Sequence, residues 1–193
     1  MRSLNLGTKH AHCSSWSDYS DLYERSIKDP VGFWSELAQQ LYLEKPWDEG
    51  RFLEYNFDIR KGPVFVRWMS GALSNVCYNV LDRHVKNGYG DKVAFYWEGN
   101  DPNDSQQRTY QELLDDVCRF ANVLKSKNVK KGDRVAIYLP VILQLPVVML
   151  ACARLDANAE VLVTADGAWR GSKLINLKKI ADHALVICRK QYV

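Results

Sequence analysis

The fold is decided by the stretch KGDRVAIYLP at residues 131–140, which leads into a mostly apolar segment at 143–154. A charged turn with a glycine comes first, a short apolar run follows, and Pro140 ends the run. An apolar run bounded by turn signals is typical of a buried strand. The stretch therefore predicts a strand at 134–139 followed by a helix at 142–154, which is the building block of a parallel sheet.

Further regular elements are predicted on both sides of this unit. A helix at 109–127 begins with the capping-box sequence Thr109-Tyr110-Gln111-Glu112, in which the hydroxyl and the carboxylate satisfy backbone N–H groups. The other predicted elements are a helix at 75–85, strands at 93–98 and 160–164, a turn at 99–104 and a helix at 174–188. This alternation predicts an α/β fold, a parallel sheet with flanking helices and right-handed crossovers.

The first part of the chain has a different character. Residues 1–18 predict a disordered tail, and residues 19–78 are rich in aromatic side chains without a regular period. Only a helix at 31–43 and a short strand at 64–66 stand out. We expect this aromatic-rich N-terminal segment to be a lid or belt on a larger body, and not an independent domain.

Composition excludes several classes of protein. The net charge of +3 and the absence of a basic stripe argue against a nucleic-acid partner. The longest apolar stretch, 145–153, is far shorter than the roughly 20 residues of a membrane helix, so we expect a soluble protein with no membrane partner. The five cysteines, an odd number without a Cys-x-x-Cys pair, favour a reducing compartment. We expect the cytoplasm, and the weakly basic start leaves the mitochondrion open.

The candidate site is the loop at 165–173. Parallel sheets bind ligands at the carboxyl ends of their strands, and this loop follows the strand at 160–164 with two glycines and two cations. Arginine can grip a phosphate through two hydrogen bonds, and lysine adds a point charge. The alternative is a solvated turn. We assign no catalytic and no metal-binding residue. The candidate binding residues are Arg170, Gly171, Ser172 and Lys173.

The sequence does not match other known binding motifs. Gly88-Tyr89-Gly90 lacks the third glycine of a dinucleotide fingerprint, and no phosphate loop of the Gly-x-x-x-x-Gly-Lys type exists. The segment 101–112 resembles a calcium loop but has Gln106 where glycine is needed, and Glu112 is better used in the capping box. Asp115 and Asp116 are consecutive on a helix, so they point in different directions and are interpreted as surface charges.

Several ordered motifs resemble one family, the AMP-forming acetyl-CoA synthetases. The resemblance runs from about residue 19 to residue 188. It implies a partial large domain of the adenylate-forming enzymes at 79–193, preceded by that family's N-terminal segment at 19–78. The motifs that carry it are FW at 33–34, YNFD at 55–58, NVLDRH at 79–84, GDKVAFYWEG at 90–99 and KGDRVAIY at 131–138.

The resemblance implies a ligase with ATP-binding and CoA-binding functions. In that family acetate attacks ATP, which is bound with Mg, to give acetyl-adenylate and pyrophosphate, and the CoA thiol then takes the acetyl group. The partners are thus small-molecule substrates: acetate, ATP and CoA. The family's Arg-x-x-Arg turn, which contacts CoA, corresponds to Arg170 and Lys173. The lysine at position 173 cannot form the two parallel hydrogen bonds to a phosphate that the family's arginine can form.

Two departures from the family change the expectation for this chain. After Arg154 the family has a further strand and helix, which are missing here, and Val193 precedes the family's phosphate loop and its C-terminal domain. We therefore expect a fragment that is inactive alone. The alternative is a non-catalytic module that binds CoA or associates with a full-length synthetase. Loss of a strand also predicts exposed apolar surface and a poorly folded or partner-dependent product.

Overall fold

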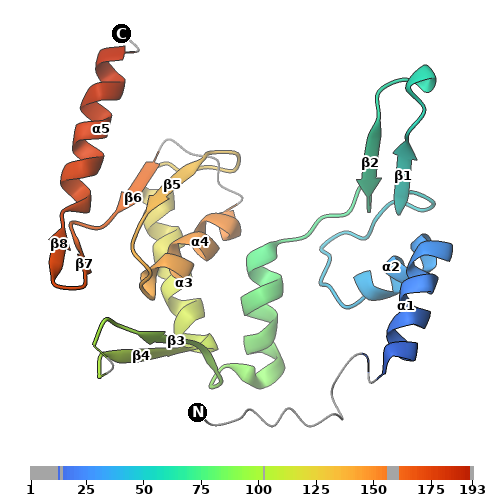
Figure 1. The fold of residues 1–193 in the computed structure, drawn as a ribbon, viewed down its shortest axis with the longest axis horizontal. Coiled ribbons are helices and arrows are strands. Elements are labelled where there is room, and N and C mark those ends of the chain that lie inside the picture. The colour runs from blue at the N-terminus through green and yellow to red at the C-terminus, as the bar shows by residue number, and fades with distance from the viewer. Residues whose placement is uncertain (1–12, 14, 102, 156–160, 192–193) are drawn as a thin grey trace. The chain divides into compact units, whose positions relative to one another are not determined.

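The structure is a computed structural model that describes residues 13, 15–101, 103–155 and 161–191. The chain divides into two compact units, Met1–Ser74 and Asn75–Val193. Figure 1 shows the elements of each unit in chain order. The described residues contain helices and strands in mixed order, with small two-stranded sheets.

The first unit opens with two helices, α1 (Trp16–Lys28) and α2 (Pro30–Ala38). Ser15 caps α1 by accepting the Asp18 N–H, and Asp29 caps α2 by accepting the Gly32 N–H. The prediction missed α1, and residues 16–18 lie in this helix instead of the predicted tail. Helix α2 is shorter than the predicted 31–43, because the chain from Tyr42 to Lys45 turns back to bond with Leu73 and Ser74.

A hairpin and an aromatic cluster complete the first unit. Strand β1 (Leu53–Asn56) pairs antiparallel with β2 (Phe65–Trp68), and a short 3-10 helix, η2 (Ile59–Lys61), lies between them. The predicted strand at 64–66 is thus confirmed in part. Phe52 is buried and packs edge-on against Trp47 and Trp68, with ring centroids 4.9 and 5.6 Å apart. Trp34 of α2 joins the cluster through Trp68.

The second unit has its core between helices α3 (Tyr110–Ser126) and α4 (Gln144–Leu155). Both helices were predicted, and α4 begins two residues later than expected. The helix predicted at 75–85 is confirmed as one helical run from residue 76 to residue 89, in which η3 (Tyr78–Asp82) and η4 (Val85–Tyr89) have π-helical geometry. Gly88, with φ +82°, kinks the chain near the end of η4. The largest fully buried side chains of this core are Cys77, Leu81, Val117 and Leu124.

The strands of the second unit form pairs and not one parallel sheet. Strand β3 (Val93–Glu98) was predicted, but its antiparallel partner β4 (Ser105–Thr109) was not. Strand β5 (Val135–Tyr138) and strand β6 (Val161–Thr164) are parallel and in register, from Val135 opposite Val161 to Tyr138 opposite Thr164. Among the described strands this is the only parallel pair, so the predicted parallel sheet is confirmed in this pair alone.

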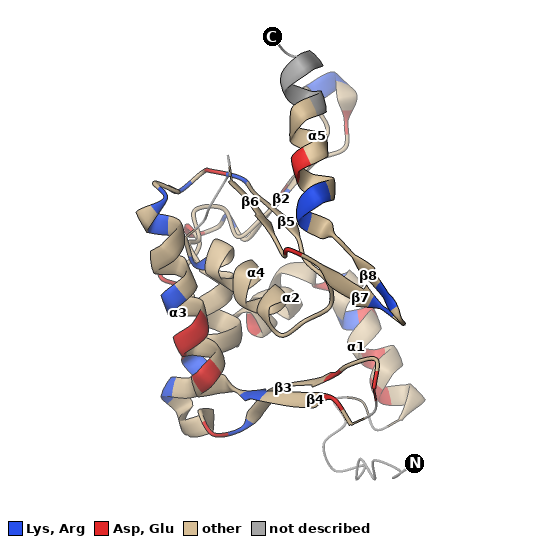
Figure 2. Cartoon of the chain, turned by 90° about the vertical axis from the view of Figure 1, so that its left-hand side faces the viewer, with Lys and Arg blue, Asp and Glu red and all other residues tan. Residues whose placement is uncertain are grey.

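The segment after β6 differs most from the prediction. The expected loop at 165–173 is largely a hairpin of β7 (Ala168–Arg170) and β8 (Lys173–Ile175), and α5 (Leu177–Gln191) begins only after it. Leu177 and Ala181 are buried where α5 packs against β6, whereas Ile180, Ala184 and Leu185, which share the helical spacing, are exposed. The reason is visible in Figures 1 and 2, where α5 runs beyond the edge of β6 after its first turns.

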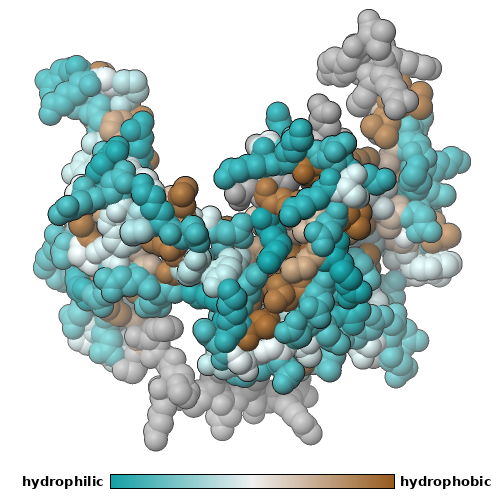
Figure 3. All heavy atoms as spheres, turned by 180° about the vertical axis from the view of Figure 1, so that it is seen from behind, coloured by the Kyte–Doolittle hydropathy of each residue, from teal (hydrophilic) through white to brown (hydrophobic). Residues whose placement is uncertain are grey.

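Apolar side chains reach the surface of both units (Figure 3). In the second unit Met149 of α4 is 55% exposed, although Val147 and Ala151 of the same helix are buried against α3. Helix α1 has no buried residue, and Trp16, Tyr19, Tyr23 and Ile27 line one exposed face of it. No helix within the described ranges is long and apolar enough to cross a bilayer.

Candidate functional site

The β7–β8 hairpin is held between the end of β6 and the start of α5. The chain leaves β6 at Thr164, and the backbone carbonyl of Asp166 accepts the N–H of Lys178 in the first turn of α5 at 3.2 Å. The Asp166 carboxylate accepts the Gly167 N–H at 2.9 Å. A side chain at Gly167 would lie 3.2 Å from the Ile175 carbonyl and from Leu174, so the backbone passes close to β8 here. These contacts fix the hairpin at the carboxyl end of β6.

The turn of the hairpin brings the four predicted binding residues together. Gly171 has φ +60° and Ser172 has no positive φ, which is the pattern of a type II′ turn with glycine in its first central position. Arg170 and Lys173 flank the turn and are directly opposite each other in the ladder. All four residues are exposed.

The placement of Arg170 and Lys173 has an electrostatic consequence. Side chains of directly opposite residues project from the same face of a hairpin, with Cβ atoms about 5 Å apart. Two like charges at this distance destabilise the pair, and an anion between them would relieve the repulsion. The turn therefore groups the predicted phosphate-binding cations on one face, and phosphate binding there stays a prediction.

A pocket that the sequence did not reveal lies beside the turn. Its volume is about 500 Å³. Lys173 is shared with the turn, and Lys179 and His183 are added from α5, one helical turn apart. Figure 2 shows basic residues on the hairpin and on the first turns of α5. The lining residues are Lys173, Leu174, Ile175, Asn176, Lys179, Ile180 and His183.

The pocket carries positive charge without a compensating acid. No Asp or Glu lines it, and among the described residues no ion pair joins Lys173, Lys179 or His183 to a carboxylate. Lys178 is different, since it pairs with Asp182 one turn further along α5. Asn176 caps α5 by accepting the Lys179 N–H at 2.8 Å. The four-residue spacing of Lys179 and His183 was the signal of this pocket in the sequence. It indicates a pocket only once β8 is known to lie beside α5.

A second charged group in this unit is structural. Arg154 at the end of α4 donates two hydrogen bonds to the Asp82 carboxylate, at 2.7 and 2.9 Å, and a weaker one to the Cys77 sulfur at 3.7 Å. The hydrogen bonds to Asp82 raise the pKa of Arg154, and burial raises the pKa of the Cys77 thiol. Asn75 donates to the Ala153 carbonyl at 3.0 Å. These bonds tie η3 to the end of α4.

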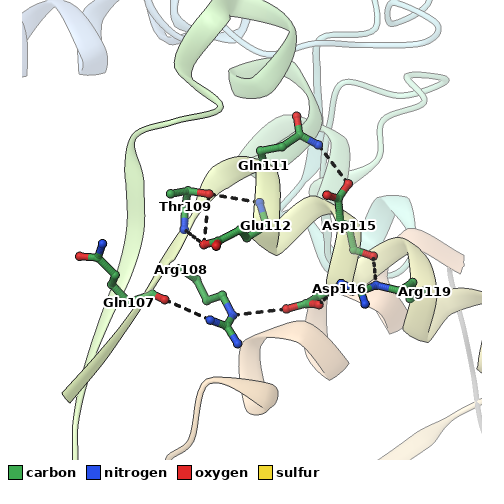
Figure 4. Close-up of polar contacts among 8 residues, drawn as sticks. All are labelled: Gln107, Arg108, Thr109, Gln111, Glu112, Asp115, Asp116 and Arg119. Atoms are coloured by element: carbon green, nitrogen blue, oxygen red, sulfur yellow. Dashed lines mark hydrogen bonds and ion pairs between the residues drawn. The ribbon is translucent and has the colours of Figure 1, made fainter. Parts of the chain in front are cut away.

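The acidic residues that the sequence analysis considered as possible site residues make structural contacts. Figure 4 shows the capping box at the start of α3: Thr109 accepts the Glu112 N–H at 3.2 Å, and the Glu112 carboxylate accepts the Thr109 N–H at 2.9 Å. That bond lowers the pKa of Glu112. As predicted, Asp115 and Asp116 point to different partners, Gln111 and Arg119. Among the described residues, no group of three His, Cys, Asp or Glu side chains is placed to hold a metal ion.

Comparisons with known proteins cover both units. The family of AMP-binding enzymes matches residues 81–191. The family described as acetyl-coenzyme A synthetase N-terminus matches residues 19–80.

Curated relatives carry the name acetyl-coenzyme A synthetase. The one from Drosophila melanogaster is 48% identical over 92% of this chain and 30% of its own length. The chloroplastic/glyoxysomal one from Arabidopsis thaliana is 42% identical over 89% of this chain and 26% of its own length. The one from Syntrophus aciditrophicus is 44% identical, over 91% and 30%. The chain therefore spans less than a third of the length of these relatives.

The alignments also indicate gaps in this chain. The match to the Drosophila relative runs over 200 positions, which is more than the 193 residues that the chain has. Some positions of the relative therefore face no residue here.

Proposed function

The chain belongs to the AMP-binding enzymes, within the acetyl-CoA synthetase family, and we propose that it serves the AMP-forming ligation of acetate to CoA. In this reaction an acetate oxygen attacks the α-phosphorus of ATP, and pyrophosphate leaves as acetyl-adenylate forms. The CoA sulfur then attacks the acetyl carbon, and AMP leaves as the thioester forms. ATP enters such a reaction with magnesium, and we assign no residue of this chain to that complex.

Within this reaction we assign CoA binding to the β7–β8 turn. The observation that carries the assignment is the opposed pair of Arg170 and Lys173, two cations on one face of a type II′ turn without an acid between them. Arg170 can hold a phosphate with two parallel hydrogen bonds, whereas Lys173 offers a single charged centre. Gly171 and Ser172 leave the backbone of the turn open to a ligand. We assign no catalytic residue to this chain.

Isothermal titration of the chain with CoA tests the assignment. Arg170→Ala should weaken binding about tenfold or more, the effect of losing one or two charge-assisted hydrogen bonds. Arg119→Ala is the matched control, because Arg119 is an exposed arginine of α3 that pairs with Asp116. The assignment fails if CoA does not bind, or if Arg170→Ala and Arg119→Ala bind it equally well.

A second candidate function is CoA binding without catalysis, in a module that works beside a synthetase. It is favoured by the local character of the site, since all its cations lie between residues 170 and 183. Acetate-dependent exchange of pyrophosphate into ATP separates the two candidates. Exchange by the purified chain would support the ligase, and CoA binding without exchange would support the module.

We also propose how the chain corresponds to the family. Residues 19–78 would be the acetyl-CoA synthetase N-terminal segment and 79–193 part of the large domain of the adenylate-forming enzymes, with a strand and a helix missing after Arg154. The two family matches meet between residues 80 and 81, which supports the division. The alignment that is longer than the chain supports an internal gap.

A further inference from the structure

We propose that the exposed apolar face of α1 is a self-association surface, through which two copies of this chain form a weak antiparallel dimer. The face consists of Trp16, Tyr19, Tyr23 and Ile27 and is called here the aromatic face of α1. It lies in the first unit, whereas the turn to which CoA binding is assigned lies in the second. The inference therefore does not depend on the proposed function.

The first argument is the continuity of the aromatic face. Its residues follow one another at the spacing of one helical face, within about 80° around the helix. The ring centroids of Trp16 and Tyr19 are 5.3 Å apart, and those of Tyr19 and Tyr23 are 6.1 Å apart. Trp16 is 79% exposed and Ile27 60% exposed. Although α1 contacts α2, this row of apolar side chains is therefore open to solvent.

The second argument is that the aromatic face is complementary to itself. A two-fold axis perpendicular to α1, near residues 21 and 22, would set two copies antiparallel with the same surface on both sides. Trp16 of one copy would then lie opposite Ile27 of the other, and Tyr19 opposite Tyr23. A large indole would meet a smaller aliphatic side chain, and the phenol rings could stack in offset pairs. The antiparallel arrangement also places the positive end of each helix dipole beside the negative end of the other.

The third argument is the charge on the rest of α1. The helix has three acidic and two basic side chains, and none of them belongs to the aromatic face. Lys28 pairs with Glu24 at 2.6 Å, and Arg25 pairs with Glu36 of α2. Helices that lie on a membrane are rich in lysine and arginine, so this slightly acidic helix does not suit an anionic lipid surface. Because the basic side chains are neutralised within each copy, two copies can approach without strong repulsion.

The fourth argument is the area that the aromatic face can bury. A large aromatic side chain buries about 150–250 Å², so at the observed exposures the three rings offer roughly 300–450 Å² on each copy. With Ile27, two copies would bury on the order of 800–1,000 Å² in total. Stable specific interfaces bury about 1,200 Å² or more, and transient ones bury less. We therefore expect a reversible dimer, with a dissociation constant on the order of tens of micromolar.

Sedimentation velocity of the full chain tests the association. At concentrations about tenfold below and tenfold above the expected dissociation constant, the wild type should change from mostly monomer to mostly dimer. Tyr19→Glu and Tyr23→Glu each place a charge in the interface and should weaken the association about tenfold or more. Ser17→Glu is the matched control, because Ser17 is an exposed residue of α1 outside the aromatic face.

Hydrogen exchange at the same two concentrations locates the interface. This second measurement is needed because apolar side chains of other elements are exposed as well. The amides of α1 should exchange more slowly at the higher concentration, since the dimer would hold a helix that buries no residue in the single chain. The amides of α3 should exchange at the same rate at both concentrations.

Three results would each overturn the proposal. The first is a chain that stays monomeric over the whole range, whether its aromatic face is covered by another part of the same chain or binds a different protein. The second is an association that Tyr19→Glu and Tyr23→Glu leave unchanged, and the third is exchange of α1 that does not depend on concentration. All three substituted residues are exposed, so circular dichroism should show an unchanged helix content. For a variant that loses helix content, the exchange of α1 in the wild type decides.

Discussion

The ion pair between Arg154 and Asp82 offers a sharp test of the second unit, because its two partners differ in exposure. The Asp82 side chain is 11% exposed and the Arg154 side chain 31% exposed. Two parallel hydrogen bonds join them, at 2.7 and 2.9 Å, next to the fully buried Cys77. Arg154→Ala leaves a carboxylate with little access to water. Asp82→Asn leaves a guanidinium that water can partly reach.

The two substitutions should therefore have unequal costs. Removing one partner of a buried ion pair costs about 3–5 kcal/mol. We expect about 3 kcal/mol for Arg154→Ala, because Asp82 is nearly buried, and about 2 kcal/mol for Asp82→Asn, because partial solvation lowers the penalty. Since each 1.4 kcal/mol is a factor of ten, these values correspond to roughly 150-fold and 30-fold changes in an opening equilibrium.

Labelling of Cys77 by a thiol reagent measures this opening directly. The sulfur is buried, and burial raises its pKa, so it reacts only when the region opens. In a variant with Cys77 as the only cysteine, Arg154→Ala should accelerate labelling more than Asp82→Asn. Arg119→Ala is the control, since it removes an exposed pair that is worth at most about 1 kcal/mol. Rates within twofold of the parent variant, or the reverse order, would refute the reasoning.

Three further predictions concern the start of α3 and the hairpin. Thr109→Ala removes the cap of α3 and should lower the free energy of unfolding by about 1 kcal/mol in urea titrations. The capping bond lowers the pKa of Glu112, so its stabilisation is present above the ordinary pKa of 4.5 and is lost as pH falls through the lowered value. Glu112→Gln should remove this part of the acid sensitivity, as thermal unfolding at a series of pH values would show. Gly171→Ala forces φ +60° on a residue with a side chain, at a cost of about 1 kcal/mol, and should speed hydrogen exchange of β7 and β8 while α3 exchanges unchanged.

The sequence predicted the elements whose side chains are buried at a regular spacing. Helix α3 places Leu113, Val117 and Leu124 on one buried face and begins with a capping box. Strands β5 and β6 are short apolar runs with turn residues before them. In each case the residues within the element carry the signal. The boundaries shifted by a few residues where a tertiary contact, such as that of Tyr42 with Ser74, ended a helix early.

The elements that the sequence missed are stabilised by pairing with a neighbouring strand or by a cap. Strand β4 is polar, and what makes it a strand is its pairing with β3, where Gln106 is opposite Trp97. Strands β7 and β8 have three residues each, too few for a period to show. Helix α1 buries no residue, and the local signals that could have revealed it were its Ser15 cap and the helical spacing of Trp16, Tyr19, Tyr23 and Ile27.

The candidate site has one half that the sequence could predict, the turn of the hairpin, and one that it could not, the residues of α5. Arg170 to Lys173 could be predicted, because a glycine and two cations within one turn are a local pattern. Lys179 and His183 could not, because their approach to β8 depends on the burial of Leu177 and Ala181 in the first turns of α5. At the carboxyl end of a strand, the sequence therefore predicts candidate binding residues within the loop, and not those that a later helix adds.

The proposed gap after Arg154 also has a physical logic. Loss of a strand alone would reverse the direction of everything that follows, whereas loss of a strand together with its helix keeps the alternation. The proposed loss of both agrees with the structure, in which β5 and β6 are parallel and in register. Helix α4 keeps Val147 and Ala151 buried against α3, and Arg154 keeps its bonds to Asp82. The hairpin and α5 consequently follow a strand that ends at the same edge as β5, which is the edge where a parallel pair binds its ligand.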